Sequence, residues 1–256
     1  MNLLKAEKLS KVFGGLKAVS NFEMHIEKGE LIGLIGPNGA GKTTAFNLLT
    51  GVYQPTTGVI EFDGESVIGL KPFQITQKGI ARTFQNIRLF SELSVLDNVK
   101  IAYHSHVKYS VAEAVFRVGR YFKEEQEIEE KAIEFLKIFK LEHKKDEIAK
   151  NLPYGEQRRL EIARALAAKP KLLLLDEPAA GMNPQETQQL MEMIHWIRDE
   201  FGLTILLIEH DMSLVMGVCE RIYVLEYGSI IAHGTPDEIK NNPKVIEAYL
   251  GEEVVS

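Results

Sequence analysis

Short runs of consecutive apolar residues alternate along this chain with segments in which apolar side chains recur at helical spacing. Residues 31–35, 172–175 and 204–208 are continuous apolar runs of strand length. Such runs are typical of strands that are covered on both faces of a parallel sheet. Residues 221–232 contain two apolar stretches around Tyr227-Gly228, which predicts a hairpin. The pattern therefore predicts an α/β fold with a parallel sheet and an antiparallel β part.

The pattern changes between about residue 92 and residue 157. Apolar residues recur at helical spacing at positions 111, 114, 115 and 118, and again at 128, 132, 135 and 139, so helices are expected there. The acidic run 123–130 is expected to be a solvated helix start. We therefore expect a single domain, residues 1–256, whose α/β core is formed by residues 1–91 and 158–256 and is interrupted by a helical subdomain at 92–157.

Composition and charge exclude several classes of function. The chain has 256 residues and a formal net charge of −6, from 30 Lys and Arg against 36 Asp and Glu. This balance is not typical of a nucleic-acid-binding protein, so no nucleic-acid partner is expected. The single cysteine, Cys219, excludes an internal disulfide and a cysteine-based metal site. No apolar run reaches the roughly 18 residues that span a bilayer, and no signal peptide is apparent, so we expect a soluble, cytoplasmic protein.

The clearest chemical signal lies between the apolar run 31–35 and the helix expected after it. The sequence of residues 36–44 is Gly-Pro-Asn-Gly-Ala-Gly-Lys-Thr-Thr, which matches the phosphate-binding pattern of the P-loop nucleotide hydrolases. Glycines let backbone N–H groups approach phosphate oxygens, and a helix N-terminus favours an anion. Lys42 can reach the β- and γ-phosphates, and the Thr43 hydroxyl can bind Mg²⁺. The residues expected to bind the nucleotide are Gly36, Pro37, Asn38, Gly39, Ala40, Gly41, Lys42, Thr43 and Thr44.

A second candidate site follows the apolar run 172–175, where Asp176 and Glu177 stand at the end of an expected strand. Ligands bind at the carboxyl ends of strands in a parallel sheet. Asp176 is placed to hold Mg²⁺, directly or through water, and Glu177 could polarise a water molecule for attack on the γ-phosphate. Strands often end in acidic turns, so the pair gains its significance from the phosphate loop upstream.

Further segments, in the same order along the chain, resemble those of the ATP-binding cassette (ABC) ATPases, and the resemblance covers essentially the whole chain. Residues 152–166 occupy the place of the signature segment of that family, just before the Asp-Glu strand. Gln85 matches the Q-loop glutamine, and His210 matches the switch histidine. Phe13 stands where the family places an aromatic ring that stacks on adenine, and Val19 is expected among the nucleotide contacts.

The resemblance implies an ATPase in which two subunits close head to tail on two ATP molecules. The phosphate loop and the groups that act on the γ-phosphate would come from one subunit, and the signature segment from the other. Glu177 would activate the water, His210 would orient it, and Gln85 would sense Mg²⁺. The catalytic residues are then Glu177, His210, Gln85 and Lys42, the metal contacts Thr43, Gln85 and Asp176, and the signature contacts Tyr154, Gly155 and Glu156.

The signature departs from the general pattern of the family. Pro153 replaces the usual Ser and removes a hydroxyl and a backbone N–H, Tyr154 replaces a Gly, and Glu156 adds a charge near an anion. Asn183 stands in place of the common Asp of the D-loop. An active ATPase is still expected, because the chain keeps all five groups that act on phosphate: Lys42, Gln85, Asp176, Glu177 and His210.

A narrower resemblance is to the LivG-type ATPases of branched-chain amino acid importers. It rests on residues 13–19, 82–85, 154–155 and 178–184 and on the long stretch between Gln85 and the signature. It implies a second ATPase of LivF type or a homodimer, two transmembrane permease subunits and, indirectly, a substrate-binding protein, with this chain peripheral on the inner face of the cell membrane. The alternatives are the ATPase of another ABC system such as lipopolysaccharide export, a soluble ABC ATPase, and a binding module without hydrolysis.

Overall fold

The computed structural model describes residues 2–104, 107–210 and 212–253, and the chain forms two compact units. The first unit consists of Met1–Arg82 and Lys171–Ser256, and the second of Thr83–Pro170. The second unit is longer at both ends than the helical segment 92–157 expected from the sequence. One reason is that helix α6 (Tyr154–Ala167) packs against α3 (Val95–Tyr103) and belongs with the helices before it.

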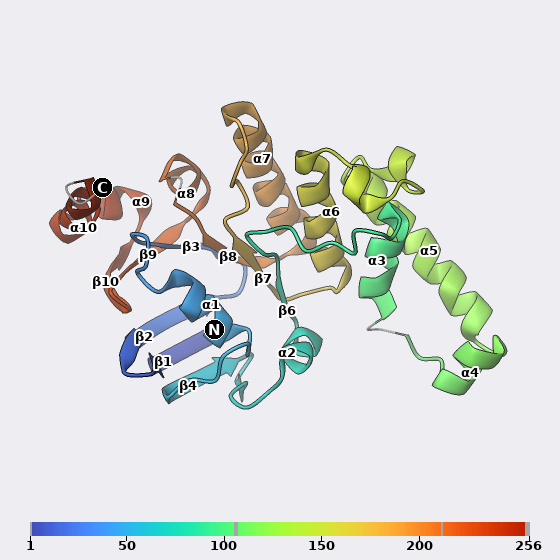
Figure 1. Cartoon of the computed structure of the whole chain (residues 1–256), viewed down its shortest axis with the longest axis horizontal. Coiled ribbons are helices and arrows are strands. Elements are labelled where there is room, and N and C mark those ends of the chain that lie inside the picture. Colours follow the sequence, from blue (N-terminus) through green and yellow to red (C-terminus); the bar gives the residue numbers. More distant parts are fainter. Residues whose placement is uncertain (1, 105–106, 211, 254–256) are drawn as a thin grey trace. The chain divides into compact units, whose positions relative to one another are not determined.

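A six-stranded sheet forms the centre of the first unit (Figure 1), in the order β10-β9-β3-β8-β7-β6. All neighbouring strands are parallel except β9 and β10, which form the predicted hairpin. Strands β3, β7 and β8 are buried along their whole length, so the three apolar runs are confirmed as central strands. The strands are β3 (Leu31–Ile35), β6 (Ile80–Arg82), β7 (Leu172–Asp176), β8 (Thr204–Ile208), β9 (Arg221–Glu226) and β10 (Ser229–Gly234).

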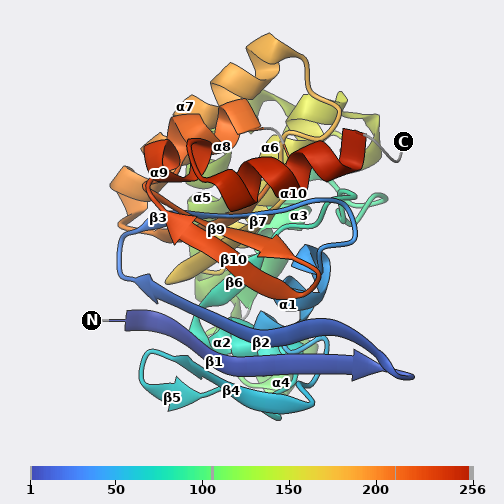
Figure 2. The same ribbon diagram turned by 90° about the vertical axis from the view of Figure 1, so that its left-hand side faces the viewer.

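A four-stranded antiparallel sheet, ordered β2-β1-β4-β5, completes the β structure of this unit; in Figure 2 it lies below the β9–β10 hairpin. One cluster of buried side chains joins both sheets and helix α1, with Phe22, Phe46 and Phe62 among its largest members. The strands are β1 (Asn2–Phe13), β2 (Leu16–Glu27), β4 (Thr57–Phe62) and β5 (Glu65–Ser66). The predicted α/β class with a parallel sheet and an antiparallel part is therefore confirmed.

Six helices are described in the first unit. Helix α1 starts at the glycine-rich turn, α7 packs against α8, and α9 and α10 contact β10 (Figure 2). Asn183 caps the start of α7: its Oδ1 accepts a hydrogen bond from the N–H of Glu186 at 3.0 Å. The helices are α1 (Lys42–Leu49), α2 (Pro72–Lys78), α7 (Pro184–Phe201), α8 (Met212–Val218), α9 (Pro236–Lys240) and α10 (Pro243–Glu253).

The second unit is helical, as the spacing predicts. Besides α3 and α6 it contains α4 (Val111–Phe116) and α5 (Tyr121–Ile138), and α5 includes the acidic run 123–130. Helix α4 ends earlier than the apolar spacing suggests, because Arg117 adopts a left-handed conformation with φ of 51°. Among the described residues of the whole chain, no helix combines the length and apolar character needed to cross a bilayer.

Candidate active site

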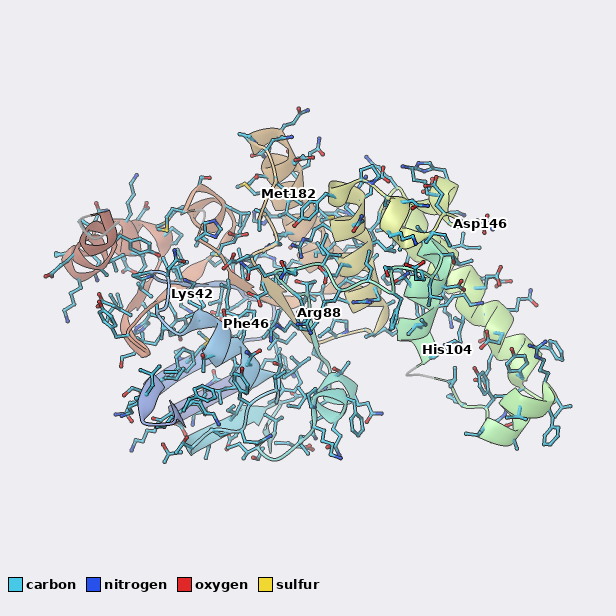
Figure 3. The ribbon with its side chains drawn as sticks, viewed as in Figure 1. Lys42, Phe46, Arg88, His104, Asp146 and Met182 are labelled. Carbon is cyan, nitrogen blue, oxygen red and sulfur yellow. The ribbon has the colours of Figure 1, made fainter. Side chains whose placement is uncertain are left out.

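The glycine-rich turn joins β3 to α1 and folds back on its own lysine. Lys42 is buried, and its Nζ donates hydrogen bonds to the carbonyl oxygens of Gly36 at 2.5 Å and Pro37 at 2.9 Å. Figure 3 shows Lys42 at the start of α1, one turn before Phe46. The ammonium group is therefore held inside the loop that the sequence predicts to wrap around phosphate.

At two positions of this loop, neighbouring backbone leaves no room for any residue but glycine. A Cβ atom at Gly36 would lie 2.0 Å from the carbonyl oxygen of Leu225, and one at Gly41 would lie 2.5 Å from that of Ala18. Their φ angles are 152° and 103°, a region that other residues rarely adopt. The first and last glycines of the motif therefore fit the loop between neighbouring backbone segments.

The turn between β9 and β10 supports the phosphate loop. The N–H of Gly228 donates to the carbonyl of Ala40 at 2.8 Å, and its carbonyl accepts from the N–H of Ser20 at 2.8 Å. The neighbouring Val19 is completely buried in the core. Its side chain therefore has no exposed surface to offer the nucleotide that the resemblance assigns to it.

An exposed aromatic pair lies at the end of β1. Phe13 is 39% exposed, and its ring packs edge-to-face with Tyr53, with ring centroids 5.1 Å apart. The Nζ of Lys11 lies 5.0 Å from the centroid of the Phe13 ring. Because the two rings are inclined at 74°, a planar base could stack on the ring of Phe13, which Tyr53 supports from the side, with the Lys11 cation close by. The sequence contains no local signal that would connect Tyr53 with Phe13.

Asp176, at the end of β7, is fixed by Arg82 at the end of β6. The Arg82 Nη2 lies 2.6 Å from the Asp176 Oδ2, and the two side chains are 9% and 6% exposed. Arg82 also donates to the Asn47 Oδ1 at 2.6 Å, and its guanidinium lies 5.5 Å from the centroid of the Phe46 ring. Arg82 therefore connects the carboxylate to the helix that starts at the phosphate loop. Sequence analysis missed this role.

Glu177 follows in an unusual backbone conformation. Its φ is 44°, in the left-handed region, and its N–H donates to the carbonyl of Ile208 at 2.9 Å. The Glu177 Oε2 lies 3.6 Å from the Nδ1 of His210, whose side chain is 62% exposed. The structure thus brings together these two predicted residues, which come from the ends of adjacent strands β7 and β8.

Glu209 connects the turns that carry Glu177 and His210, and sequence analysis gave it no role. The side chain is fully buried. Its Oε1 accepts a hydrogen bond from the N–H of Ala179 at 2.8 Å, and its Oε2 accepts one from the N–H of His210 at 3.1 Å. A carboxylate directly after a buried strand, at the edge where ligands bind, is the sequence signal that could have identified it.

The signature segment forms the start of α6 in the second unit, with Tyr154 as the first helical residue and Pro153 before it. The Glu156 Oε2 lies 2.7 Å from the Nζ of Lys144, and its Oε1 lies 3.8 Å from Arg159. The extra charge that distinguishes this signature is therefore compensated within the unit, which the sequence did not reveal.

A buried arginine ties the signature helix to the Q-loop. Arg158 is fully buried and donates hydrogen bonds to the carbonyl oxygens of Phe84 at 2.7 Å and Gln85 at 2.8 Å, and to the Tyr154 hydroxyl at 3.3 Å. Its Nη1 lies 2.7 Å from the Oε2 of Glu161, whose Oε1 accepts from the N–H of Phe84 at 3.4 Å. The backbone around Gln85 and the signature tyrosine thus share one hydrogen-bond network centred on the buried Arg158.

Comparison with known proteins identifies the class to which this fold and these motifs belong. The family described as ABC transporter matches residues 19–180. A crystal structure of the ADP conformation of an ATP-binding cassette of an ABC transporter is 33% identical, with a TM-score of 0.85, and the alignment covers 98% of this chain and 99% of the other. The crystal structure of a nucleotide-free ATP-binding cassette from an ABC transporter is 34% identical, with a TM-score of 0.83, and the alignment covers 97% of this chain and 99% of the other. The chain belongs to the ABC transporter family.

Within this family, the sequence resembles proteins named for branched-chain amino acid transport. A family described as branched-chain amino acid ATP-binding cassette transporter matches residues 229–255. The high-affinity branched-chain amino acid transport ATP-binding proteins BraF of Pseudomonas aeruginosa and LivG of Escherichia coli are 46% and 48% identical, each over 98% of both chains. The lipopolysaccharide export system ATP-binding protein LptB of Escherichia coli is 38% identical over 99% of both chains.

Proposed function

We propose that this chain is the ATP-binding and hydrolysing subunit that powers import of branched-chain amino acids, or of related amino acids or amides, through a membrane permease. The observation that carries the proposal is the identity of 46–48% to BraF and LivG over nearly the whole chain. The lower identity of 38% to LptB makes lipopolysaccharide export the weaker alternative. The groups that hydrolysis needs, from Lys42 to His210, are all present.

ATP would bind in the first unit, with its phosphates in the loop and its adenine on the Phe13–Tyr53 pair. Lys42 would exchange the two loop carbonyl oxygens that it now contacts for the β- and γ-phosphates. That exchange replaces neutral acceptors with anionic ones, which form stronger hydrogen bonds. Binding should therefore order the loop around the phosphates.

Mg²⁺ would be held by Thr43, Asp176 and Gln85, directly or through water, and would neutralise charge on the phosphate oxygens when bound. Among the described residues there is no cluster of three or more His, Cys, Asp or Glu side chains that could hold a metal ion. This donor set fits a cation that keeps several water molecules and binds to substrate phosphates with one or two carboxylates. It does not fit a metal site made by the protein alone.

Glu177 would accept the proton of the attacking water, and His210 would hold the γ-phosphate and keep Glu177 in place. The 3.6 Å separation of the two side chains supports this pairing. Glu209 would act as a positioning residue, because it fixes the backbone on both sides of the pair. Gln85 would report on the metal and water, and the Arg158 network would transmit its movement to the signature helix.

The signature residues Tyr154, Gly155 and Glu156 would act on the ATP of a second ATPase subunit, either LivF-type or a second copy of this chain. The signature residues form the first turn of α6, which starts at Tyr154, and a helix N-terminus favours an anion. Two transmembrane permease subunits and, through them, a substrate-binding protein would complete the importer. The chain would then lie on the inner face of the cell membrane.

The test uses the variant Glu177→Gln, loaded with ATP, as bait in a detergent extract of native membranes. We expect two multispanning permeases and a second ATPase to co-purify, since this variant should hold ATP without hydrolysing it. The matched control is Lys42→Ala, which should lose the second ATPase because it no longer binds the phosphates. Recovery of lipid-export components, or of ribosomal or DNA-repair proteins, would refute the importer assignment.

A further inference from the structure

The segment 107–123 of the second unit exposes an unusual number of large apolar side chains. They lie on α4, on the turn after it and at the start of α5, and each is between 54% and 82% exposed. Water-exposed apolar groups at this density mark a surface that binds a protein or a membrane. The exposed residues are Val111, Val115, Phe116, Val118 and Phe122.

This segment is folded and presents these side chains on one small structure. Glu113 of α4 accepts a hydrogen bond from the N–H of Arg120 at 3.3 Å, and its side chain pairs with the Arg120 guanidinium at 3.4 Å. The N–H of Val118 donates to the Glu113 carbonyl at 3.1 Å. Helix α4 and the start of α5 are therefore joined, so the apolar residues are displayed together.

The same segment is positively charged within a negatively charged chain. Residues 107–123 contain four cations, Lys108, Arg117, Arg120 and Lys123, against the single acid Glu113, whereas the whole chain has a net charge of −6. Glu113 is paired with Arg120, and the acids of α5 begin at Glu124, directly after the segment. A partner for this surface should therefore combine apolar and anionic groups.

A hollow of about 600 Å³ opens beside this segment and has a cationic lining. Five of its lining residues are Lys or Arg, and two are acids, Glu124 and Glu127. The Glu124 Oε2 already accepts the backbone N–H of Lys108 at 2.8 Å. Within the described chain, the lysine side chains of this lining have no ion-pair or hydrogen-bond partner. The five cations are Lys108, Arg120, Lys123, Lys131 and Lys169.

We propose that the apolar side chains of 107–123 and the cationic hollow together dock this unit on an anionic lipid bilayer. Lipid phosphates would occupy the hollow, and the Val and Phe side chains would enter the boundary between headgroups and acyl chains, as they do in amphipathic membrane-surface helices. Each cation near an anionic leaflet adds attraction. A permease surface fits less well, since cytoplasmic loops carry an excess of Lys and Arg and would repel this patch.

This docking needs neither ATP nor a permease, so it can be tested on the purified full chain. Phe116→Cys is labelled with an environment-sensitive fluorophore and mixed with vesicles of phosphatidylcholine, with or without phosphatidylglycerol. The native Cys219 should not react, because it is buried and burial raises the pKa of its thiol. We expect a blue shift only with the phosphatidylglycerol vesicles, and loss of that shift at high salt.

Charge-reversal variants test which cations are responsible. The double variant Lys123→Glu and Lys131→Glu should bind phosphatidylglycerol vesicles at least about tenfold more weakly, given the attraction that each cation near the surface contributes. The matched control, Lys137→Glu with Lys240→Glu, makes the same change in net charge at exposed positions outside the hollow and should bind as the parent does.

The apolar part is tested with Phe122→Ser against the control Phe73→Ser, an exposed phenylalanine of the first unit. Phe122→Ser should weaken vesicle binding, and Phe73→Ser should not. Equal effects of test and control variants, or equal binding to both kinds of vesicle, would overturn the proposal. So would absence of vesicle binding together with crosslinking of residue 116 to a permease. ATP hydrolysis in solution should be unchanged in all these variants, which separates this test from that of the proposed function.

Discussion

The left-handed backbone of Glu177 predicts which of two inactive variants, Glu177→Gly or Glu177→Ala, is the more stable. With φ at 44°, this residue sits in a conformation that costs an L-amino acid about 1–2 kcal/mol. Glycine adopts it without that cost. The hydrogen bond from the N–H of Glu177 to the carbonyl of Ile208 holds the turn in this shape, so the conformation should persist in variants of this residue. Glu177→Gly should therefore release strain that Glu177→Ala retains.

The net gain is smaller than the strain, because glycine also loses more freedom on folding. That loss is about 0.4–1 kcal/mol relative to alanine, so Glu177→Gly should be more stable than Glu177→Ala by about 0.5–1 kcal/mol. For a protein of this size, a difference of about 1 kcal/mol corresponds to about 2–4 °C in melting temperature. Differential scanning calorimetry without nucleotide measures it, and both variants should lose ATP hydrolysis.

The matched control applies the same two substitutions to Glu192, an exposed residue inside α7. There the sign should reverse, with glycine about 1 kcal/mol less stable than alanine, because the backbone is right-handed helix. If glycine were the less stable residue at both positions, the left-handed turn would not store strain. The account of how Glu177 is presented would then be refuted.

Three further predictions concern the Arg158–Glu161 ion pair, Gly36 and His25. Arg158→Met and Glu161→Leu should each destabilise the fold by about 3–5 kcal/mol, because each leaves a buried charge unpaired. If the losses in the free energy of unfolding in urea simply added up in the double variant, the two side chains would not stabilise each other as an ion pair. Gly36→Ala should abolish binding of a fluorescent ATP analogue, since its Cβ would lie 2.0 Å from a β9 carbonyl oxygen; unchanged affinity would mean that the loop can move. Burial, and next the Arg221 guanidinium, hold the pKa of His25 below its ordinary 6.5, so folding disfavours protonation and stability falls as pH drops below 6.5. His25→Gln should lose less stability over that range in urea unfolding, and equal losses would exclude His25 as the cause.

The central strands and the phosphate loop could be predicted because their signals are local. The apolar runs 31–35, 172–175 and 204–208 became β3, β7 and β8 without ambiguity, since a strand covered on both faces needs every position apolar. The glycine pattern at 36–41 is equally local, because it reflects conformations that only glycine adopts easily.

The groups that position the site were missed because each depends on residues far apart in the sequence. Arg82 meets Asp176 across 94 positions, and Glu209 reaches Ala179 across 30. Arg158 contacts the backbone of Gln85 across 73 positions. A single sequence does not reveal the partners in such contacts: the place of Glu209 after a buried strand marks it as a site residue, but not as a contact of Ala179.

Burial and ion pairing explain the remaining differences between the roles expected from the sequence and the surroundings of these side chains in the structure. Val19 was expected to contact the nucleotide, but it lies next to the loop on a strand whose inward face belongs to the core. Likewise, the charge of Glu156 suggested a disturbed signature until Lys144 was found 2.7 Å away. Motif matching identifies positions along the chain, whereas the direction and partners of a side chain follow from packing.

The most direct test of the account is the rate of Mg²⁺-dependent ATP hydrolysis by the purified chain and by Glu177→Gln, with nucleotide affinity measured on the same samples. The parent should hydrolyse ATP, and the variant should be slower by about 10²–10⁴-fold, as expected for loss of a general base, while binding ATP with the same affinity. Hydrolysis by Glu177→Gln at the parental rate would show that Glu177 is not the base and would contradict the proposed mechanism.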